Sequence, residues 1–267
     1  IHDGVAVTKF LYWIQKNQNK KISEINAEKK LESFRKQNKN YLFPSFSTIS
    51  ATGKNGSIIH YRASNKTCRE IKRNDIYLCD SGGQYNYGTT DVTRTISFKK
   101  QTKNIKDTFT RVLKGHIAVA TADISKQKTG SNIDKLARKY LKKVKKNFSH
   151  GTGHGVGYFL NVHEGPQSIS KRNNVKLKEG MILSNEPGFY LQGKYGIRIE
   201  NLVYIKKEKN NLFFKNLTMA PIDMSLVNLR LLNSQEKKYL IEYHLNVYAK
   251  LYKFLSLNEK KWFLKSI

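Results

Sequence analysis

The chain contains 267 residues, of which 39% are hydrophobic and 11% aromatic, so it can bury a sizeable core and a disordered chain is excluded. Lysine and arginine number 49 against 20 aspartate and glutamate residues, which gives a formal net charge of +29. This excess fits either a polyanionic partner or a lysine-coated surface. Because no nucleic-acid-binding signature accompanies it, we do not expect nucleic acid to be a partner.

The sequence carries no sign of a membrane or secretory protein. No stretch approaches the roughly 18 consecutive apolar residues of a membrane span, and no membrane partner is expected. The chain opens IHDGVAVTKF, without an initiator methionine or a basic leader, so we expect an excerpt of a longer protein without a signal peptide. Two cysteines, Cys68 and Cys79, cannot form a disulfide framework. We therefore expect a cytoplasmic location.

Hydrophobic periodicity predicts the first half of the chain in this order. Helices are expected at 3–17 and 22–36, a β-hairpin at 46–63 with its tip at TGKNG, and a strand at 75–80. Helices are expected again at 104–126 and at 131–146, the second with Ser131 and Asp134 as a capping box.

In the second half, the glycine-rich segment 149–159 is not expected to be helical. Strands are predicted at 181–190 and 196–206, and a further strand and turn at 211–222, followed by a long helix at 234–255 and a short helix near Trp262. Two strand-rich blocks, 46–98 and 175–222, are thus separated by helices. We expect one α+β domain whose polar chemistry lies between two halves.

Four carboxylates occupy positions at or near the ends of apolar strands. Asp80 follows IYLC, Asp91 lies eleven residues later, Glu186 follows MILSN and Glu200 follows GIRI. Buried carboxylates are costly unless they are paired or bound to metal, and four cannot crowd together without a cation. His154 in GTGHGVG adds a candidate nitrogen ligand. This mostly oxygen ligand set suits two divalent ions such as Mn²⁺.

Each of these residues also has a simpler interpretation when taken alone. Asp80 can start a turn before SGG, Asp91 can be a β-edge residue, and His154 can be a core histidine with satisfied hydrogen bonds. Glu186 and Glu200 can be exposed strand residues. The metal hypothesis therefore depends on all five residues together.

The complete pattern resembles a known family. The segments DSGGQYNYGTTDVTRT, HGTGHGVGYFLNVHEGP, SNEPGFY and YGIRIEN are similar to those of the pita-bread metallopeptidases, which include aminopeptidase P, prolidase and methionine aminopeptidase. TTDVTRT and LTMAPIDMSLVNLRLL are most similar to aminopeptidase P of the long, cytosolic type, and the resemblance covers essentially the whole chain. It implies the pita-bread (creatinase/aminopeptidase) fold, with two pseudo-symmetric strand-rich halves covered by helices.

The resemblance also implies a division of the chain. Residues 1–222 would form the catalytic domain, and residues 223–267 would form a C-terminal helical extension packed on it. Long-type members carry N-terminal domains before a segment like IHDGVAVTKFLYWI, and this sequence begins there. We therefore expect those N-terminal domains to be absent from this chain.

The resemblance assigns a role to each site residue. Asp91 and Glu200 would bridge two ions, Asp80 would complete one coordination sphere, and His154 with Glu186 would complete the other. Glu186 would also act as the general base that moves a proton to the leaving proline nitrogen.

Four further residues would act on the substrate. His60 and His163 would stabilise the oxyanion and, with His150, contact the substrate. Arg198 would order the surroundings of the ligands or meet a substrate carboxylate, with a structural ion pair as the alternative. The remaining histidines are assigned to the surface or to helix faces: His2, His116 and His244.

The implied function is hydrolysis of the N-terminal Xaa-Pro peptide bond by a water that a dinuclear metal centre, expected to be Mn²⁺, activates. Its substrates would be peptides with proline at the second position, and a homodimer is a further expectation. One alternative is a prolidase that cleaves Xaa-Pro dipeptides. The other is a non-enzymatic pita-bread protein that binds nucleic acid through its charge, although such a protein has no need of four costly carboxylates.

Overall fold

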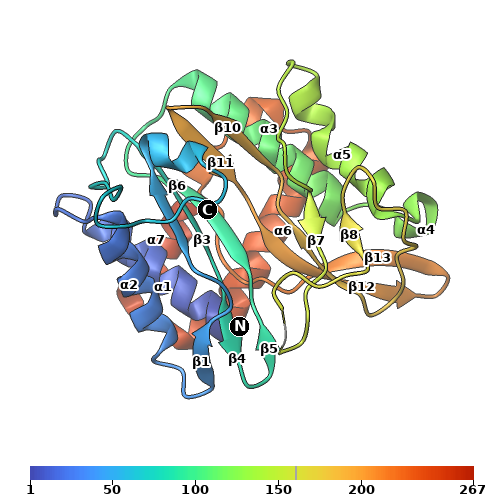
Figure 1. The fold of residues 1–267 in the computed structure, drawn as a ribbon, viewed down its shortest axis with the longest axis horizontal. Helices are drawn as coiled ribbons and strands as arrows, with labels where there is room; N and C mark the ends of the chain where they lie inside the picture. Colours follow the sequence, from blue (N-terminus) through green and yellow to red (C-terminus); the bar gives the residue numbers. More distant parts are fainter. Residues whose placement is uncertain (160) are drawn as a thin grey trace.

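The computed structural model describes residues 1–159 and 161–267 (Figure 1). The helices of this part of the chain are α1 (His2–Lys16), α2 (Glu24–Arg35), α3 (Lys103–Ala120), α4 (Ile124–Gln127), α5 (Gly130–Lys142), α6 (Ser234–Leu251) and α7 (Leu257–Ser266). Short 3₁₀ turns add η1 (Gly53–Ser57), η2 (Met224–Leu226), η3 (Leu229–Leu231) and η4 (Tyr252–Phe254).

The strands are short and gather in two blocks along the chain. The first block holds β1 (Tyr41–Pro44), β2 (Ile49–Thr52), β3 (Ile76–Ser81), β4 (Gly83–Tyr85), β5 (Gly88–Thr89) and β6 (Val92–Ser97). The second holds β7 (Gly153–His154), β8 (Ser168–Ile169), β9 (Ile182–Asn185), β10 (Gly188–Leu191), β11 (Tyr195–Arg198), β12 (Asn201–Glu208) and β13 (Asn211–Asn216). This arrangement is the α+β fold expected from the sequence.

Two three-stranded antiparallel sheets form the centre, with the orders β2-β3-β6 and β13-β12-β9. The two blocks meet where β6 passes the residues around the end of β11. There the Glu200 N–H donates to the Thr93 carbonyl at 3.2 Å, and the Arg198 N–H donates to the Thr95 hydroxyl at 3.1 Å. These bonds place the start of β6 beside the segment between β11 and β12.

Helices cover this centre from two sides (Figure 1). The α3 helix begins where the Thr102 hydroxyl accepts from the Ile105 N–H, and apolar residues at i, i+3 and i+4 spacing form its buried face. Phe109, Val112 and Leu113 on this face join one core cluster with side chains of α5, β11 and α6. The α1, α2 and α7 helices lie on the other side, where α1 packs against both α2 and α7.

The predicted hairpin at 46–63 is wrong. β2 pairs with β3 instead, and the chain then enters the η1 turn, with no strand after it until β3. Gly53 does adopt a left-handed conformation, with φ of +52°. In the second half of the expected hairpin a polar group bonds to a distant helix instead: the Tyr61 hydroxyl donates to the Glu24 carboxylate of α2 at 2.8 Å.

Several helix boundaries also differ from the prediction. The helix predicted at 104–126 breaks after Ala120, and the Asp123 side chain caps the separate α4. The expected capping box of α5 is absent among the described contacts, because Asp134 is buried and accepts hydrogen bonds from Arg138 and Thr152, each at 2.7 Å. The helix predicted at 234–255 ends at Leu251 with a 3₁₀ turn after it.

Candidate active site

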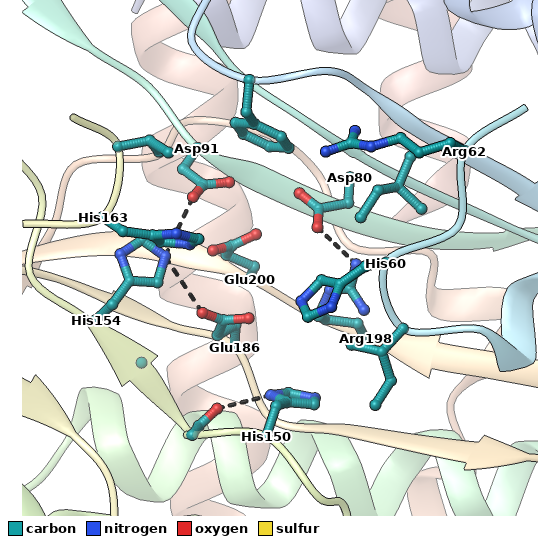
Figure 2. A pocket seen from close by; sticks show the side chains of 16 residues that line it. His60, Arg62, Asp80, Asp91, His150, His154, His163, Glu186, Arg198 and Glu200 are labelled. Carbon is teal, nitrogen blue, oxygen red and sulfur yellow. Dashed lines mark hydrogen bonds and ion pairs between the residues drawn. The ribbon is translucent and has the colours of Figure 1, made fainter.

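All nine side chains singled out from the sequence line one cavity of about 480 Å³ (Figure 2). They are the five candidate ligands Asp80, Asp91, His154, Glu186 and Glu200, together with His60, His150, His163 and Arg198. The carboxylates of Asp91, Glu186 and Glu200 lie toward the centre of the cavity, and Asp80 faces them from the side of His60 and Arg198.

Strand ends deliver the five candidate ligands. Asp80 lies on β3 and pairs in register with Thr93 of β6, and Asp91 directly precedes that strand. Glu200 occupies the short link between β11 and β12. Glu186 follows β9, where its N–H donates to the Thr152 carbonyl at 2.8 Å, and His154 lies on the neighbouring β7.

The orientation of His154 shows what the site can hold. Its Nδ1–H donates to the Gly155 carbonyl at 2.9 Å, so Nε2 faces the cavity and presents a lone pair there whenever it carries no proton. That Nε2 lies 3.4 Å from Asp91 Oδ2 and 3.4 Å from Glu186 Oε1. A lone pair facing two carboxylates is repulsive unless a proton or a metal ion lies between them, and this geometry is typical of a metal-binding histidine.

The carboxylates show the same need for positive charge. Burial, followed by the charges of Asp80 and Glu186, raises the pKa of Asp91 well above its usual range. Burial and the charge of Asp91 do the same to the pKa of Glu200, and burial raises the pKa of Glu186. Oδ1 of Asp80 and Oδ1 of Asp91 are buried without a hydrogen-bond donor among the described residues.

These observations fit divalent cations held by hard ligands. Asp91, His154 and Glu200 each offer one ligand atom within 4.8 Å of the other two, and Glu186 adjoins them through His154. Carboxylate oxygens dominate the set, which suits Mn²⁺ or similar ions better than a structural zinc site rich in cysteine.

Two hydroxyl groups orient the ligands and were not predicted from the sequence. Thr93 donates to Glu200 Oε2 at 2.7 Å. Ser184 donates to Glu186 Oε1 at 3.0 Å and accepts from the His154 N–H at 2.9 Å. Each hydroxyl residue lies two positions from a candidate ligand along the chain, a spacing that places side chains on one side of an extended segment. This two-residue spacing is the feature of the sequence from which Thr93 and Ser184 could have been predicted.

A chain of hydrogen bonds links Arg198 to His150 through Tyr190, which the sequence also left unassigned. Arg198 pairs with Asp80 at 2.5 Å and donates to the Tyr190 hydroxyl at 2.5 Å. The hydroxyl in turn contacts His150 Nε2 at 2.9 Å, while His150 Nδ1 contacts the Gly151 carbonyl at 2.7 Å. Burial and the charge of Arg198 lower the pKa of His150 to about 3, so His150 is neutral and its Nε2 accepts a hydrogen bond from the Tyr190 hydroxyl.

The remaining two histidines face the cavity from irregular segments (Figure 2). His163 packs edge-on against the ring of His154, with 4.0 Å between ring centroids. Burial and the neighbouring His154 lower the pKa of His163, which keeps it neutral. His60 lies near Arg198 on the opposite side, in the segment that follows η1.

Comparison with known proteins identifies the family. Residues 2–207 match the model of metallopeptidase family M24, and residues 210–267 match the C-terminal region of the same peptidases. The chain belongs to metallopeptidase family M24. Its two matched regions together cover nearly the whole sequence.

Relatives of this M24 chain carry aminopeptidase and prolidase names. It is 48% identical over 264 residues to "Probable Xaa-Pro aminopeptidase P" of Laccaria bicolor, covering 94% of the chain and 41% of that protein. A solved X-prolyl aminopeptidase of Caenorhabditis elegans, described as a cytosolic enzyme with a di-nuclear active site, matches with a TM-score of 0.93 and 38% identity, over 99% of the chain and 45% of that structure. Prolidase from Pyrococcus furiosus matches with a TM-score of 0.68 and 29% identity, over 80% of the chain and 62% of that structure.

The chain therefore has the pita-bread fold of these peptidases, as expected from the sequence. It spans less than half the length of the Laccaria bicolor and Caenorhabditis elegans relatives. Within the described residues, none of the helices is both long and apolar enough to cross a bilayer.

Proposed function

We propose that this chain is the catalytic part of a metal-dependent aminopeptidase that hydrolyses the N-terminal Xaa-Pro bond of peptides. The observation that carries the proposal is the convergence of five hard ligands in one cavity, where His154 directs a lone pair at two carboxylates. The names of the most similar relatives supply the substrate class.

The proposed metal ligands are Asp80, Asp91, His154, Glu186 and Glu200, holding two divalent ions for which Mn²⁺ is the proposed identity. When bound, such ions would act as Lewis acids that acidify a water and polarise the scissile carbonyl. Because His154 Nδ1 donates to the Gly155 carbonyl, Nε2 is the ring nitrogen that would bind the metal.

Glu186 is the proposed general base. Its carboxylate lies at the cavity centre, its pKa is raised by burial, and Ser184 orients one of its oxygens at 3.0 Å. The amide nitrogen of an Xaa-Pro bond carries no proton, so the leaving imino group must receive one. A carboxylate with a raised pKa can accept a proton from water and pass it to that nitrogen.

The histidines around the ligands are proposed to act on the substrate. His60 and His163 face the cavity from two different segments and can donate hydrogen bonds to the oxygen on which negative charge develops. His150 and Arg198, linked through Tyr190, are proposed to contact the substrate beyond the scissile bond. In this structure Arg198 pairs with Asp80, so its substrate contact requires that it share this carboxylate or release it.

The test is hydrolysis of an Arg-Pro-Pro tripeptide beside an Arg-Pro dipeptide, with Mn²⁺ supplied after removal of metal by a chelator. We expect release of arginine from the tripeptide only with metal, and loss of this activity in Glu186→Gln. An Arg-Ala-Ala tripeptide is the control for proline specificity. Cleavage of the dipeptide alone would support a prolidase, and no cleavage of either proline peptide would contradict the proposal.

Three further properties are proposals of the same kind. We place the protein in the cytosol because the Caenorhabditis elegans relative is described as cytosolic. We propose a homodimer, for which the exposed Ile241 and Leu245, one turn apart on α6, offer apolar surface. We also propose that residues 1–222 form the catalytic domain and that residues 223–267 form an extension packed on it, as the shared core between α3 and α6 suggests.

A further inference from the structure

The segment 58–75 delivers His60 to the cavity although it contains no helix and no strand beyond a single bridge at Glu70. Ile59 and Arg62 of the same segment also line the cavity. Backbone pairing fixes only the far end of this segment, where the Ile71 N–H donates to the Ile22 carbonyl at 2.8 Å, and among the described residues no such ladder lies around His60. Other contacts must therefore hold His60 in place.

Those contacts converge on one buried carboxylate, Glu24, the first residue of α2, which is 0% exposed. Oε1 accepts from the Thr52 N–H at 2.7 Å, and Oε2 accepts from the Tyr61 hydroxyl at 2.8 Å and the Arg69 N–H at 2.9 Å. The Asn55 amide donates to both oxygens, at 3.1 and 3.0 Å.

The donors surround the segment that carries His60. Thr52 and Asn55 precede it, Tyr61 is the next residue after His60, and Arg69 lies near its far end. Tyr61 itself is only 4% exposed, so the packing of its ring and the bond from its hydroxyl to Glu24 fix the position of its backbone. Fixing Tyr61 limits where the backbone of His60 can lie.

This carboxylate makes no ion pair within the described part of the chain, which is unusual for a fully buried acid. Neutral donors and the positive end of the α2 helix dipole stabilise its charge instead. Charge-assisted hydrogen bonds are the stronger kind, and several of them meeting on one group make a rigid anchor.

We propose that Glu24 is a positioning residue for catalysis: it holds the 58–69 segment so that His60 faces the reacting carbonyl. The proposal rests on the proposed peptidase function, in which His60 stabilises developing charge. It predicts that loss of the anchor lowers kcat more than it raises KM, because His60 acts in the transition state.

The test compares Glu24→Gln with the wild-type protein and with Glu236→Gln. A glutamine has only one amide oxygen, so its NH₂ group must face the donors on one side of the network and leave them unpaired. Glu236 is a matched control because it is also buried, caps α6, pairs with Lys114 and does not line the cavity. Tyr61→Phe is the milder variant, since it removes a single donor to Glu24.

With Arg-Pro-Pro as substrate, we expect kcat to fall at least about 10-fold in Glu24→Gln and less in Tyr61→Phe, with bound metal unchanged. Glu236→Gln should lower thermal stability while kcat stays within about 2-fold. In a His60→Ala background, Glu24→Gln should change kcat by less than about 2-fold, because the group it positions is gone. A full additional loss in that background would overturn the proposal.

Amide hydrogen exchange supplies a readout that does not need activity. The amides of residues 58–69 should exchange at least about 10-fold faster in Glu24→Gln than in the wild-type protein. Their exchange rates should be unchanged in Glu236→Gln. If the wild-type protein cleaves no Xaa-Pro peptide, the proposed function fails while this measurement still tests the anchor. Unchanged exchange of 58–69 together with unchanged kcat in Glu24→Gln would show that Glu24 does not position His60.

Discussion

Arg94 on β6 is a buried cation that joins the C-terminal region to the strand end of Glu200. It is 2% exposed, and burial lowers its pKa. Its guanidinium donates to six acceptors at 2.6–2.9 Å: the carbonyls of Thr93, Glu200, Ala220 and Pro221, the Asn201 side chain and the Tyr243 hydroxyl. All five N–H groups of the side chain can thus be used.

Replacing this arginine by lysine keeps the charge but removes donors. An ammonium group has three N–H donors where the guanidinium has five, so at least two hydrogen bonds of the Arg94 side chain are lost in Arg94→Lys. A hydrogen bond that involves a charged group contributes about 1.5–3 kcal/mol, so we expect the loss of two to lower the free energy of unfolding by about 3–6 kcal/mol.

Urea unfolding followed by circular dichroism measures this difference, provided that the slope with urea is the same in both proteins. Arg172→Lys is the control, because Arg172 is exposed, and it should stay within about 0.5 kcal/mol of the wild-type protein. If Arg94→Lys lowers the free energy of unfolding by less than about 1 kcal/mol, the number of N–H donors does not explain how Arg94 stabilises the fold.

Three further predictions concern catalysis, pH and charge. His163→Ala should lower kcat by about 10²-fold with bound metal unchanged, and a parallel loss of metal would show that His163 is a ligand instead. His244 is buried, with its pKa lowered to about 4, so from pH 6.5 down to 4 the unfolded chain takes up a proton that the folded chain does not. As the pH falls, this group should therefore lower the free energy of unfolding by about 1.4 kcal/mol per pH unit. In urea titrations at a series of pH values, the free energy of unfolding of His244→Gln should depend on pH less steeply by that amount. Fluorescence titration with a DNA oligonucleotide should give a dissociation constant near the ~10⁻⁴–10⁻⁶ M of non-specific binding, weakening steeply with salt, and tight binding at about 0.15 M salt would support the binding-protein alternative.

The sequence predicted the elements whose determinants are local. The α3 helix follows from apolar residues at helical spacing and a threonine cap, and β3 follows from a continuous apolar run before Asp80. The four carboxylates were found from their positions beside apolar strands and His154 from its glycine-rich motif, Arg198 from its spacing to Glu200, and the other three histidines from the family resemblance. The structure brings all nine residues to one cavity. Their roles remain predictions.

The features that were missed depend on partners far away in the chain. The expected hairpin after β2 gave way to bonds from Thr52 and Tyr61 to a helix that precedes them by more than two dozen residues. The expected capping box failed because Asp134 bonds to Thr152 of a later segment. Periodicity reports which face of an element is apolar, but it does not report which distant polar group that element meets.

The buried carboxylates of this strongly basic chain fall into two groups that the sequence alone does not separate. Outside the cavity, the buried acids Asp3, Glu24, Asp134 and Glu236 accept hydrogen bonds from arginine, lysine, hydroxyl, amide or backbone donors. The partly buried Asp75 and Glu164 each have one buried oxygen without a donor in the part of the chain that the structure describes. Inside the cavity, Asp80 and Asp91 each keep one buried oxygen without a donor among the described residues. With 49 basic side chains in the chain, a lysine or arginine was available to pair with those oxygens, yet within residues 1–159 and 161–267 Arg198 is the one lysine or arginine that forms an ion pair with a carboxylate of the cluster. Unpaired buried oxygens cost free energy, so their retention beside a histidine lone pair is explained if metal ions, rather than side chains, supply the missing positive charge.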